Sequence, residues 1–345
     1  MKTYNEMLLS TPFMINGRLE SESFALRPIS PPNHMPRYEE FQYTSVFRSM
    51  FVLSLTVEVD SINPLGVDNK SLGPYHKTPL EIADMDGVRA LKVFRNFLSL
   101  HYGKIFFDHG VTRINDHFSL PNINYFIPLK NARHPVCNML DRLDFSQSGE
   151  LSNSEDSLKR LGVLLKKGTN KNKDFLKSLN LYYNALEQYN INETLSFMLF
   201  VTSIETLTHK YSKKSNITSR NLDSDDYFFT KIINIIETDV GQSENRDFLK
   251  GFVLERYKVK MKFVDFVLQF LNENFYEIWE DRGIDRSAIS KEEIEELLNR
   301  IYNLRSNYLH RGEDISIEIK LYSLLILIER ITRFILIKVF DELTA

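Results

Sequence analysis

The sequence predicts an α+β fold with a mixed N-terminal half and an all-helical C-terminal half. All 11 prolines lie at or before Pro135, and the rest of the chain contains none. Proline interrupts helices, so a long proline-free region favours long helices. Apolar residues recur with period two and then with helical period in the first half, but only with helical period in the second. We therefore expect a mixed α/β domain at 1–150 and a helical bundle at 157–345.

In the N-terminal half, the alternation of side chains over 51–59 predicts a half-buried strand. Asp86 is a candidate N-cap for a helix that runs to about His101, because apolar residues follow it at spacings of three and four. Two further short strands are expected at 104–107 (KIFF) and 124–129 (NYFIPL).

A polar, glycine-containing stretch at 146–157 predicts a linker between the halves. The helix at 192–211 is apolar nearly all round and should be buried on most sides. Ser290 and Glu293 have the spacing of a capping box at the start of another helix. The helices expected after the linker are 157–167, 172–189, 192–211, 225–238, 244–276, 290–309 and 316–340.

The charge balance limits the ways in which this chain can bind nucleic acid. With 43 basic and 46 acidic residues the net charge is -3, which excludes tight coating of nucleic acid by bulk electrostatics. The charge is uneven, however: 159–220 holds 11 Lys/Arg and 4 Asp/Glu, a net of +7, whereas the residues from 221 onward hold 17 and 24, a net of -7. A local RNA site is compatible with this distribution.

The remaining features point to a cytoplasmic protein without a cofactor. The single cysteine, Cys137, excludes an internal disulfide and suits a reducing compartment. The most apolar stretch, 321–328, is shorter than the roughly 20 residues of a membrane span, and we expect a buried helix there. No membrane association and no cofactor are expected.

Histidines and acids of the first half do not have the spacing of a familiar zinc site. They comprise Asp108-His109, Asp116-His117, His134 and Cys137. A metal centre is therefore not predicted.

The segment 305–310 (RSNYLH) contains an Arg-x4-His element on the helix expected at 290–309. At about 100° per residue, Arg305 falls in the middle of the apolar stripe of that helix, and His310 falls on the opposite side. A charge inside an apolar stripe needs a partner or a ligand. One ideal helix cannot aim both side chains at one atom, so either the chain departs from helical geometry near His310, before a helix stop at Gly312, or two copies contribute to one site.

A purely structural alternative stays open beside the functional one. Arg305 could pair with a buried acid, for which Glu205 is the candidate, while His310 lies at the surface near a helix end.

Two separated segments resemble the HEPN family, and within it the ApeA-like branch. The first is 179–211, a helix pair with Tyr182 and Tyr183 before a turn and an apolar helix that carries Ile204-Glu205. The second is 301–313 (IYNLRSNYLHRGE), which contains the Arg-x4-His element. The resemblance covers roughly 157–340.

The resemblance implies a helical bundle that forms a homodimer and acts as a metal-independent endoribonuclease in phage defence or toxin-like growth arrest. It implies RNA as substrate, with tRNA as one candidate, and a phage-derived trigger or regulatory partner. It makes Arg305 and His310 catalytic. Ser306, Asn307 and Glu205 would support the site, and Ser306 stands where Asn, Asp or His is more usual. Candidate RNA-binding residues are Arg311, Lys213 and Lys214, and the basic segments 166–173 and 209–215 could steer RNA or be solvated loops.

An alternative function is a non-catalytic module that binds RNA or a protein partner with the same bundle. In that case Ser306 would reflect relaxed demands on an active site. Residues 1–150 would most plausibly form a sensor or specificity module in either case.

Overall fold

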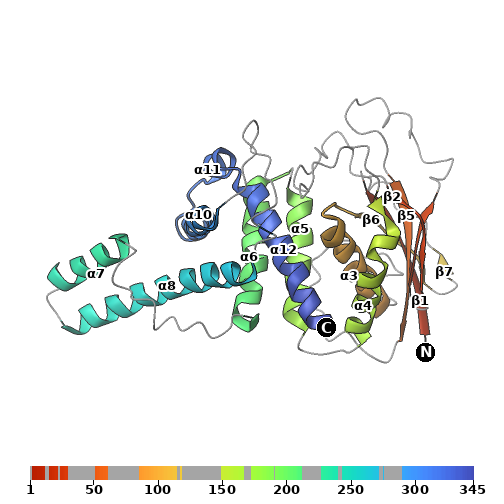
Figure 1. Cartoon of the computed structure of the whole chain (residues 1–345), viewed down its shortest axis with the longest axis horizontal. Coiled ribbons are helices and arrows are strands. Elements are labelled where there is room, and N and C mark those ends of the chain that lie inside the picture. Colours follow the sequence, from red (N-terminus) through yellow and green to blue (C-terminus); the bar gives the residue numbers. More distant parts are fainter. Residues whose placement is uncertain are drawn as a thin grey trace.

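The N-terminal part of the chain forms an antiparallel sheet that is followed by helices (Figure 1). The computed structural model describes residues 2–11, 15–21, 24–29, 51–60, 85–114, 117–118, 149–166, 172–189, 191–211, 227–239, 243–271, 275 and 290–345. The strands of the sheet are β1 (Lys2–Thr11), β3 (Leu19–Glu20), β4 (Phe24–Ile29), β5 (Phe51–Asp60), β6 (Phe107–Ile114) and β7 (His117–Phe118), in the order β3-β4-β5-β1-β6-β7. The architecture is therefore α+β, as expected.

The central strand β1 pairs antiparallel with both β5 and β6, and Met7 lies opposite Leu55. Asn5, Met7 and Leu9 on one face of β1 are fully buried, whereas on the other face Tyr4 is exposed and Leu8 is buried. A separate two-residue pairing joins β2 (Ile15–Asn16) to β8 (Gly149–Glu150) in parallel.

Helix α3 (Met85–Tyr102) packs against β1 and β5. Its Phe94 ring lies 5.3 Å from that of Phe24 in β4. Gly87 sits beside the buried Asn5 of β1, where an added Cβ would overlap the Asn5 side-chain amide. Only glycine therefore allows α3 to approach the sheet this closely.

The rest of the described chain is helical. A 3-10 turn (Leu151–Ser154) leads into α4 (Glu155–Lys166), α5 (Lys173–Gln188), α6 (Glu193–Tyr211), α7 (Tyr227–Asp239), α8 (Ser243–Phe270), α10 (Lys291–Arg311), α11 (Ser316–Leu321) and α12 (Leu324–Thr344). In Figure 1, α12 lies beside α5 and α6, and α7 with the beginning of α8 extends away from the sheet.

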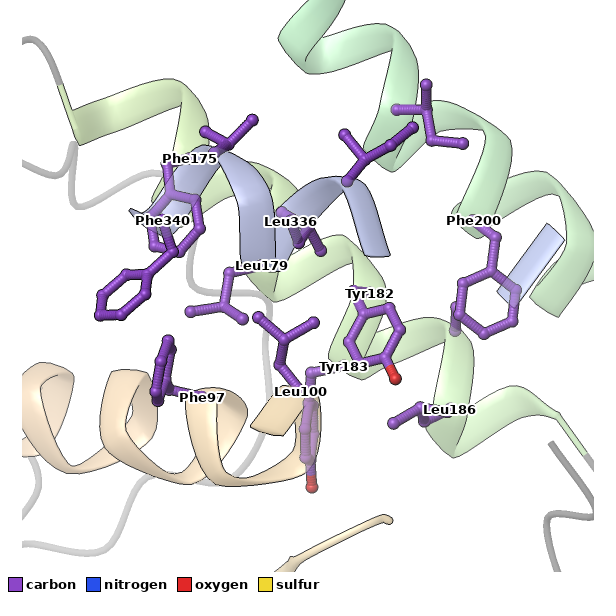
Figure 2. Close-up of a cluster of buried hydrophobic side chains, with 14 of the residues drawn as sticks. Phe97, Leu100, Phe175, Leu179, Tyr182, Tyr183, Leu186, Phe200, Leu336 and Phe340 are labelled. Carbon is purple, nitrogen blue, oxygen red and sulfur yellow. The ribbon is translucent and has the colours of Figure 1, made fainter. Parts of the chain in front are cut away.

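The apolar core is continuous between the sheet-bearing part and the helical part. Figure 2 shows Phe97 of α3 and Phe175 of α5 gathered around Phe340 of α12, with ring centroids 4.5 Å and 5.9 Å from that of Phe340. All three side chains are almost fully buried, and burial of a large apolar side chain contributes about 1.5–3 kcal/mol. The α3 helix is thus packed from one side by the sheet and from the other by the bundle.

Most of the expected elements are confirmed. The strand expected at 51–59 is β5, and the expected helices up to 309 correspond to α3, α4, α5, α6, α7, α8 and α10. The largest shift is in α8, which ends at Phe270 and not near 276. Asp86 lies inside the first turn of α3 and does not precede it.

Two expectations near the junction of the two halves are wrong, and a third cannot be compared. Residues 104–106 are not a strand, because Gly103, with φ 60°, ends α3 and the chain must turn before β6 starts at Phe107. The linker expected at 146–157 is replaced over 149–157 by β8, the 3-10 turn and the start of α4. The strand expected at 124–129 lies outside the described residues.

The helix expected at 316–340 is two helices. Ser323 adopts a left-handed conformation, with φ 49° and ψ 32°, and separates α11 from α12. A left-handed residue cannot continue a right-handed helix. The apolar run 321–328 hides this break because it has no glycine or proline, and Leu321 is consequently exposed while Leu324 and Ile328 are buried.

Candidate active site at the end of α10

Helix α10 presents the Arg-x4-His element on a well-capped helix. The Ser290 hydroxyl accepts a hydrogen bond from the Glu293 N–H at 3.1 Å, as the capping-box spacing predicts. At the other end Gly312, with φ 67°, closes the helix by donating its N–H to the Tyr308 carbonyl. The helix is therefore α-helical through His310 and up to Arg311.

Arg305 continues the apolar stripe of α10, as its position in the sequence predicts. Ile294, Leu298 and Ile301 on this stripe are fully buried. Arg305 comes one turn after Ile301, and 20% of its side chain is exposed. A cation at this position is partly desolvated, so it requires compensation from a neighbouring group.

Glu205 of α6 provides that compensation. Arg305 Nη2 donates to Glu205 Oε2 at 2.9 Å, and the Glu205 side chain is also 20% exposed. The pairing of Arg305 with Glu205, expected from the structural alternative, is confirmed. Glu205 also makes at least one further interaction.

The Arg305 guanidinium keeps unused hydrogen-bonding capacity. Its Nε is buried and has no hydrogen-bond partner among the residues that the structure describes. The centroid of the Tyr302 ring lies 5.9 Å from the guanidinium carbon, near the outer limit of a cation–π contact. Because that Nε is buried, a phosphate would have to bind the exposed part of the guanidinium or displace Glu205.

His310 does not share a site with Arg305 of the same chain. Because α10 is regular between them, the two side chains leave the helix about 140° apart. His310 is exposed in the last turn. The expected departure from helical geometry near His310 does not occur, since the left-handed residue is Gly312. Of the two ways to unite Arg305 and His310, a second copy of the chain is the one left.

The other predicted site residues lie near this end or outside the described part. Ser306 and Asn307 are half-buried on α10 directly after Arg305. Arg311 is exposed and its Nη1 lies 3.4 Å from Glu313 Oε1, an ion pair of small energetic value. Lys213 and Lys214 lie outside the described residues.

An exposed apolar surface beside α10 was not predicted. Ile317 and Leu321 of α11 have exposed fractions of 73% and 69%. We define the α11 surface as Ile191, Leu195, Ile317, Leu321 and Tyr322. The pair of Lys320 with Glu193, at 3.4 Å, joins α11 to the start of α6. The signal available in the sequence was an apolar pair at i and i+4 inside a charged segment, 316–321.

Two more exposed apolar side chains, Tyr308 and Leu309, lie on the last turn of α10 next to His310. Tyr322 of the α11 surface carries the guanidinium of Arg300 over its ring at 3.5 Å, which brings α10 and the α11–α12 turn together. Exposed apolar side chains thus lie both on the last turn of α10 and on α11.

Clearly perturbed pKa values occur elsewhere, where α3, α5 and α12 meet. Burial raises the pKa of Glu329 to about 7, although Arg333 and a hydrogen bond from Tyr182 act against the shift. Burial, with the charges of Arg333 and Arg160, lowers the pKa of His101 to about 4.

Within the described ranges, no cluster of three or more His, Cys, Asp or Glu side chains could hold a metal ion. Asp108, one of the acids near the N-terminal histidines, is paired with Arg95. The side chains of His109, Asp116 and His117 and the segment with His134 and Cys137 lie outside the described part. In the portion of the chain that was searched, no helix is long and apolar enough to span a membrane.

Compared with protein-family models, curated proteins and solved structures, the chain shows no match in any of the three.

Proposed function

We propose that this protein is a metal-independent endoribonuclease of the HEPN type, active as a homodimer in the cytoplasm and used in phage defence or toxin-like growth arrest. The observation that supports the proposal most is Arg305, an arginine in an apolar stripe that is paired with Glu205 and keeps 20% of its side chain exposed. It lies on the helix whose last turn carries the exposed His310.

The chemistry needs few protein groups, because RNA carries its own nucleophile in the 2′-OH. His310 takes the proton from the 2′-OH or gives one to the leaving 5′ oxygen. Arg305 holds the phosphate oxygens and stabilises the charge of the pentavalent transition state. The products would be a 2′,3′-cyclic phosphate and a 5′-OH. In a site with one Arg305 and one His310, the proton transfer that His310 does not perform would involve solvent water.

A composite site explains why Arg305 and His310 diverge on one helix. Two copies that meet along the ends of α10 would bring Arg305 of one chain toward His310 of the other. The exposed α11 surface, with Tyr308 and Leu309 beside it, supplies apolar area for such an association. The partner would cover side chains that are otherwise in contact with water.

The direct test is cleavage of RNA in the presence of EDTA by the wild type, Arg305→Ala and His310→Ala. We expect the wild type to cut and each variant to lose about 10³-fold in rate while keeping its fold. Cleavage that neither substitution reduces would refute the assignment of these residues. Ser306→Asn, the residue more usual in the family, should be at least as active as the wild type.

The composite nature of the site is tested by mixing two inactive variants. When Arg305→Ala and His310→Ala chains are mixed in equal amounts, half of the dimers contain one chain of each kind. One of the two sites in each such dimer would be intact, so about a quarter of the wild-type rate should return. Leu321→Glu should prevent dimerisation and abolish this recovery. A site contained in one chain would give no recovery.

A non-catalytic interaction module is the second candidate. It is favoured by the Arg305–Glu205 pair, which satisfies part of the charge without any ligand, and by the exposed α11 surface. A dimer that binds RNA but never cuts it, and whose expression in a host is not toxic, would decide for this function.

A further inference from the structure

We propose that helix α12 couples the position of α3 to the last turn of α10 and to α11, which together we call the α10–α11 end. The sheet-bearing part would thereby control the nuclease site. The connection is made by hydrogen bonds from Arg333 to α3, which we call the Arg333 clamp. The inference rests on the proposed function only in treating the α10–α11 end as the site. The coupling itself concerns the helices and can be measured without RNA.

The clamp joins α12 to the carboxyl end of α3. Arg333 Nε donates to the Leu100 carbonyl at 2.8 Å, and its Nη2 donates to the His101 carbonyl at 2.7 Å. The last four carbonyls of a helix have no partner within that helix and carry its negative dipole end. A planar guanidinium that binds two of them therefore fixes both the distance and the angle between the two helices.

A buried carboxyl group one turn earlier on α12 belongs to the same junction. Glu329 is fully buried and accepts a hydrogen bond from the Tyr182 hydroxyl of α5 at 2.7 Å. Lys104, the second residue after α3, is also buried, and its charge acts on Glu329. Buried charged groups have few geometries in which all are satisfied, so α12 is held in a discrete position relative to α3 and α5.

The opposite end of α12 leads directly to the proposed site. Ser323, in a left-handed conformation, connects α11 to α12. Gly312 ends α10 just after the turn that carries His310, and the chain then leads into α11. In Figure 1, α12 runs from α11 to the side of α3 and α4. The turn at Ser323 is a strained non-glycine backbone, which is the place where a displacement of α12 would be absorbed or passed on to α11.

The sheet can act on α3 because the two are closely packed. Gly87 of α3 touches Asn5 of the central strand, and Phe94 contacts Phe24. A trigger that binds the sheet-bearing part and shifts α3 would thus displace the carbonyls to which Arg333 is bound. Movement of α12 would follow, and with it the α10–α11 end.

The test is hydrogen exchange of the full-length protein, resolved by segment, for Arg333→Met and Arg333→Lys. The control is Arg160→Met, which removes another arginine that holds α12: Arg160 of α4 donates to Asp341 and Thr344 at 3.0 Å each. The amides of α5 around Tyr182, in the middle of the core, serve as the internal measure of global unfolding.

For Arg333→Met we expect exchange to accelerate about tenfold both at 97–106 and at 308–328, beyond any change in the α5 reference amides. Arg333→Lys should show a smaller change in the same two segments. Arg160→Met should accelerate exchange only near the ends of α4 and α12. These outcomes would stand even if no variant, nor the wild type, cleaved RNA.

Acceleration at 97–106 without any at 308–328 would overturn the proposal, because Arg333 would then be a local cap of α3. Equal acceleration in all segments, matching the α5 reference, would also overturn it. If the protein does cleave RNA, Arg333→Met should change the basal rate at least threefold and Arg160→Met should leave it unchanged.

Discussion

Arg95 and Arg305 are two arginines on buried sides of helices, and they are satisfied to different degrees. Arg95 of α3 uses all three of its nitrogens: Nε and Nη2 donate to Asn96 Oδ1 at 3.0 and 2.8 Å, and Nη1 donates to Asp108. Its guanidinium also lies 3.8 Å from the centroid of the Tyr183 ring. Arg305 has one ion pair, to Glu205, and a buried Nε without a partner among the described residues.

The difference separates a structural arginine from a candidate for ligand binding. A buried charge is tolerated when its hydrogen-bonding groups are all satisfied, which is the situation of Arg95. Arg305 has a single ion pair and 20% of its side chain is exposed, so the exposed part of its guanidinium could bind a phosphate. Substitution of Arg95 should therefore affect stability, and substitution of Arg305 should affect activity.

The largest expected effect is on cleavage by Arg305→Met. Loss of the planar donor fork should lower the rate of RNA cleavage by about 10²- to 10³-fold, because the transition-state charge loses its stabilising group. The free energy of unfolding, measured in urea, should fall by no more than about 1 kcal/mol, because a partly exposed pair contributes little. A loss of several kcal/mol would place Arg305 in the same class as Arg95.

Arg95→Met should show the opposite behaviour. Removal of a buried partner leaves Asp108 without its cation, and we expect the free energy of unfolding to fall by about 3 kcal/mol. The rate of RNA cleavage per folded molecule should stay within about twofold of the wild type, because the contacts of Arg95 are with Asn96, Asp108 and Tyr183 and not with α10 or Arg333. Urea titration and a cleavage assay on the same preparation measure both quantities.

The junction around α12 should give two opposing dependences of stability on pH. The pKa of Glu329 is raised to about 7, so the native state retains this proton more tightly than the unfolded state, and this group lowers stability as pH rises from about 4.5 to 7. The pKa of His101 is lowered to about 4, so this group lowers stability as pH falls from about 6.5 to 4.

When one of the two groups is substituted, the pH dependence of stability that remains should be the one contributed by the other group. The free energy of unfolding of Glu329→Gln should exceed that of the wild type by up to about 2–3 kcal/mol near pH 8 and by little near pH 5. The free energy of unfolding of His101→Gln should exceed that of the wild type near pH 5 and should differ little from it near pH 8. Urea unfolding at both pH values tests this, and a Glu329→Gln protein less stable than the wild type near pH 8 would contradict the assigned direction.

The smallest expected effect is that of Glu205→Gln. Because both members of the Arg305 pair are 20% exposed, loss of the negative charge should cost about 1 kcal/mol in unfolding free energy. The matched change at the other arginine, Asp108→Asn, should cost more, because the Arg95 side chain is more deeply buried. Equal costs would remove the distinction between the two arginines.

Much of this arrangement could be predicted from the sequence, because it depends on neighbours along the chain. Helical periodicity located α5, α6 and α10 to within two residues, the Ser290–Glu293 spacing located a helix start, and Gly312 a helix stop. The same periodicity placed Arg305 inside an apolar stripe. Even the pairing with Glu205 followed, since a buried cation requires an acid and few acids interrupt the apolar helix α6.

Other features depended on distant parts of the chain. The left-handed Ser323 splits an apolar run that has no helix-breaking residue, so this boundary has no local signal. The capping of α3 by Arg333 joins residues more than 230 positions apart. The pKa shifts of Glu329 and His101 likewise arise from burial among α3, α5 and α12.

By itself, the sequence determined strand β5, the approximate bounds of most helices and the position of Arg305 in an apolar stripe, because periodicity and capping act over a few residues. Only the tertiary structure decided how fully each charge is satisfied and that Arg305 and His310 leave a continuous α10 in different directions. Desolvation and hydrogen-bond satisfaction depend on every group packed around a side chain, and most of those groups come from elsewhere in the chain.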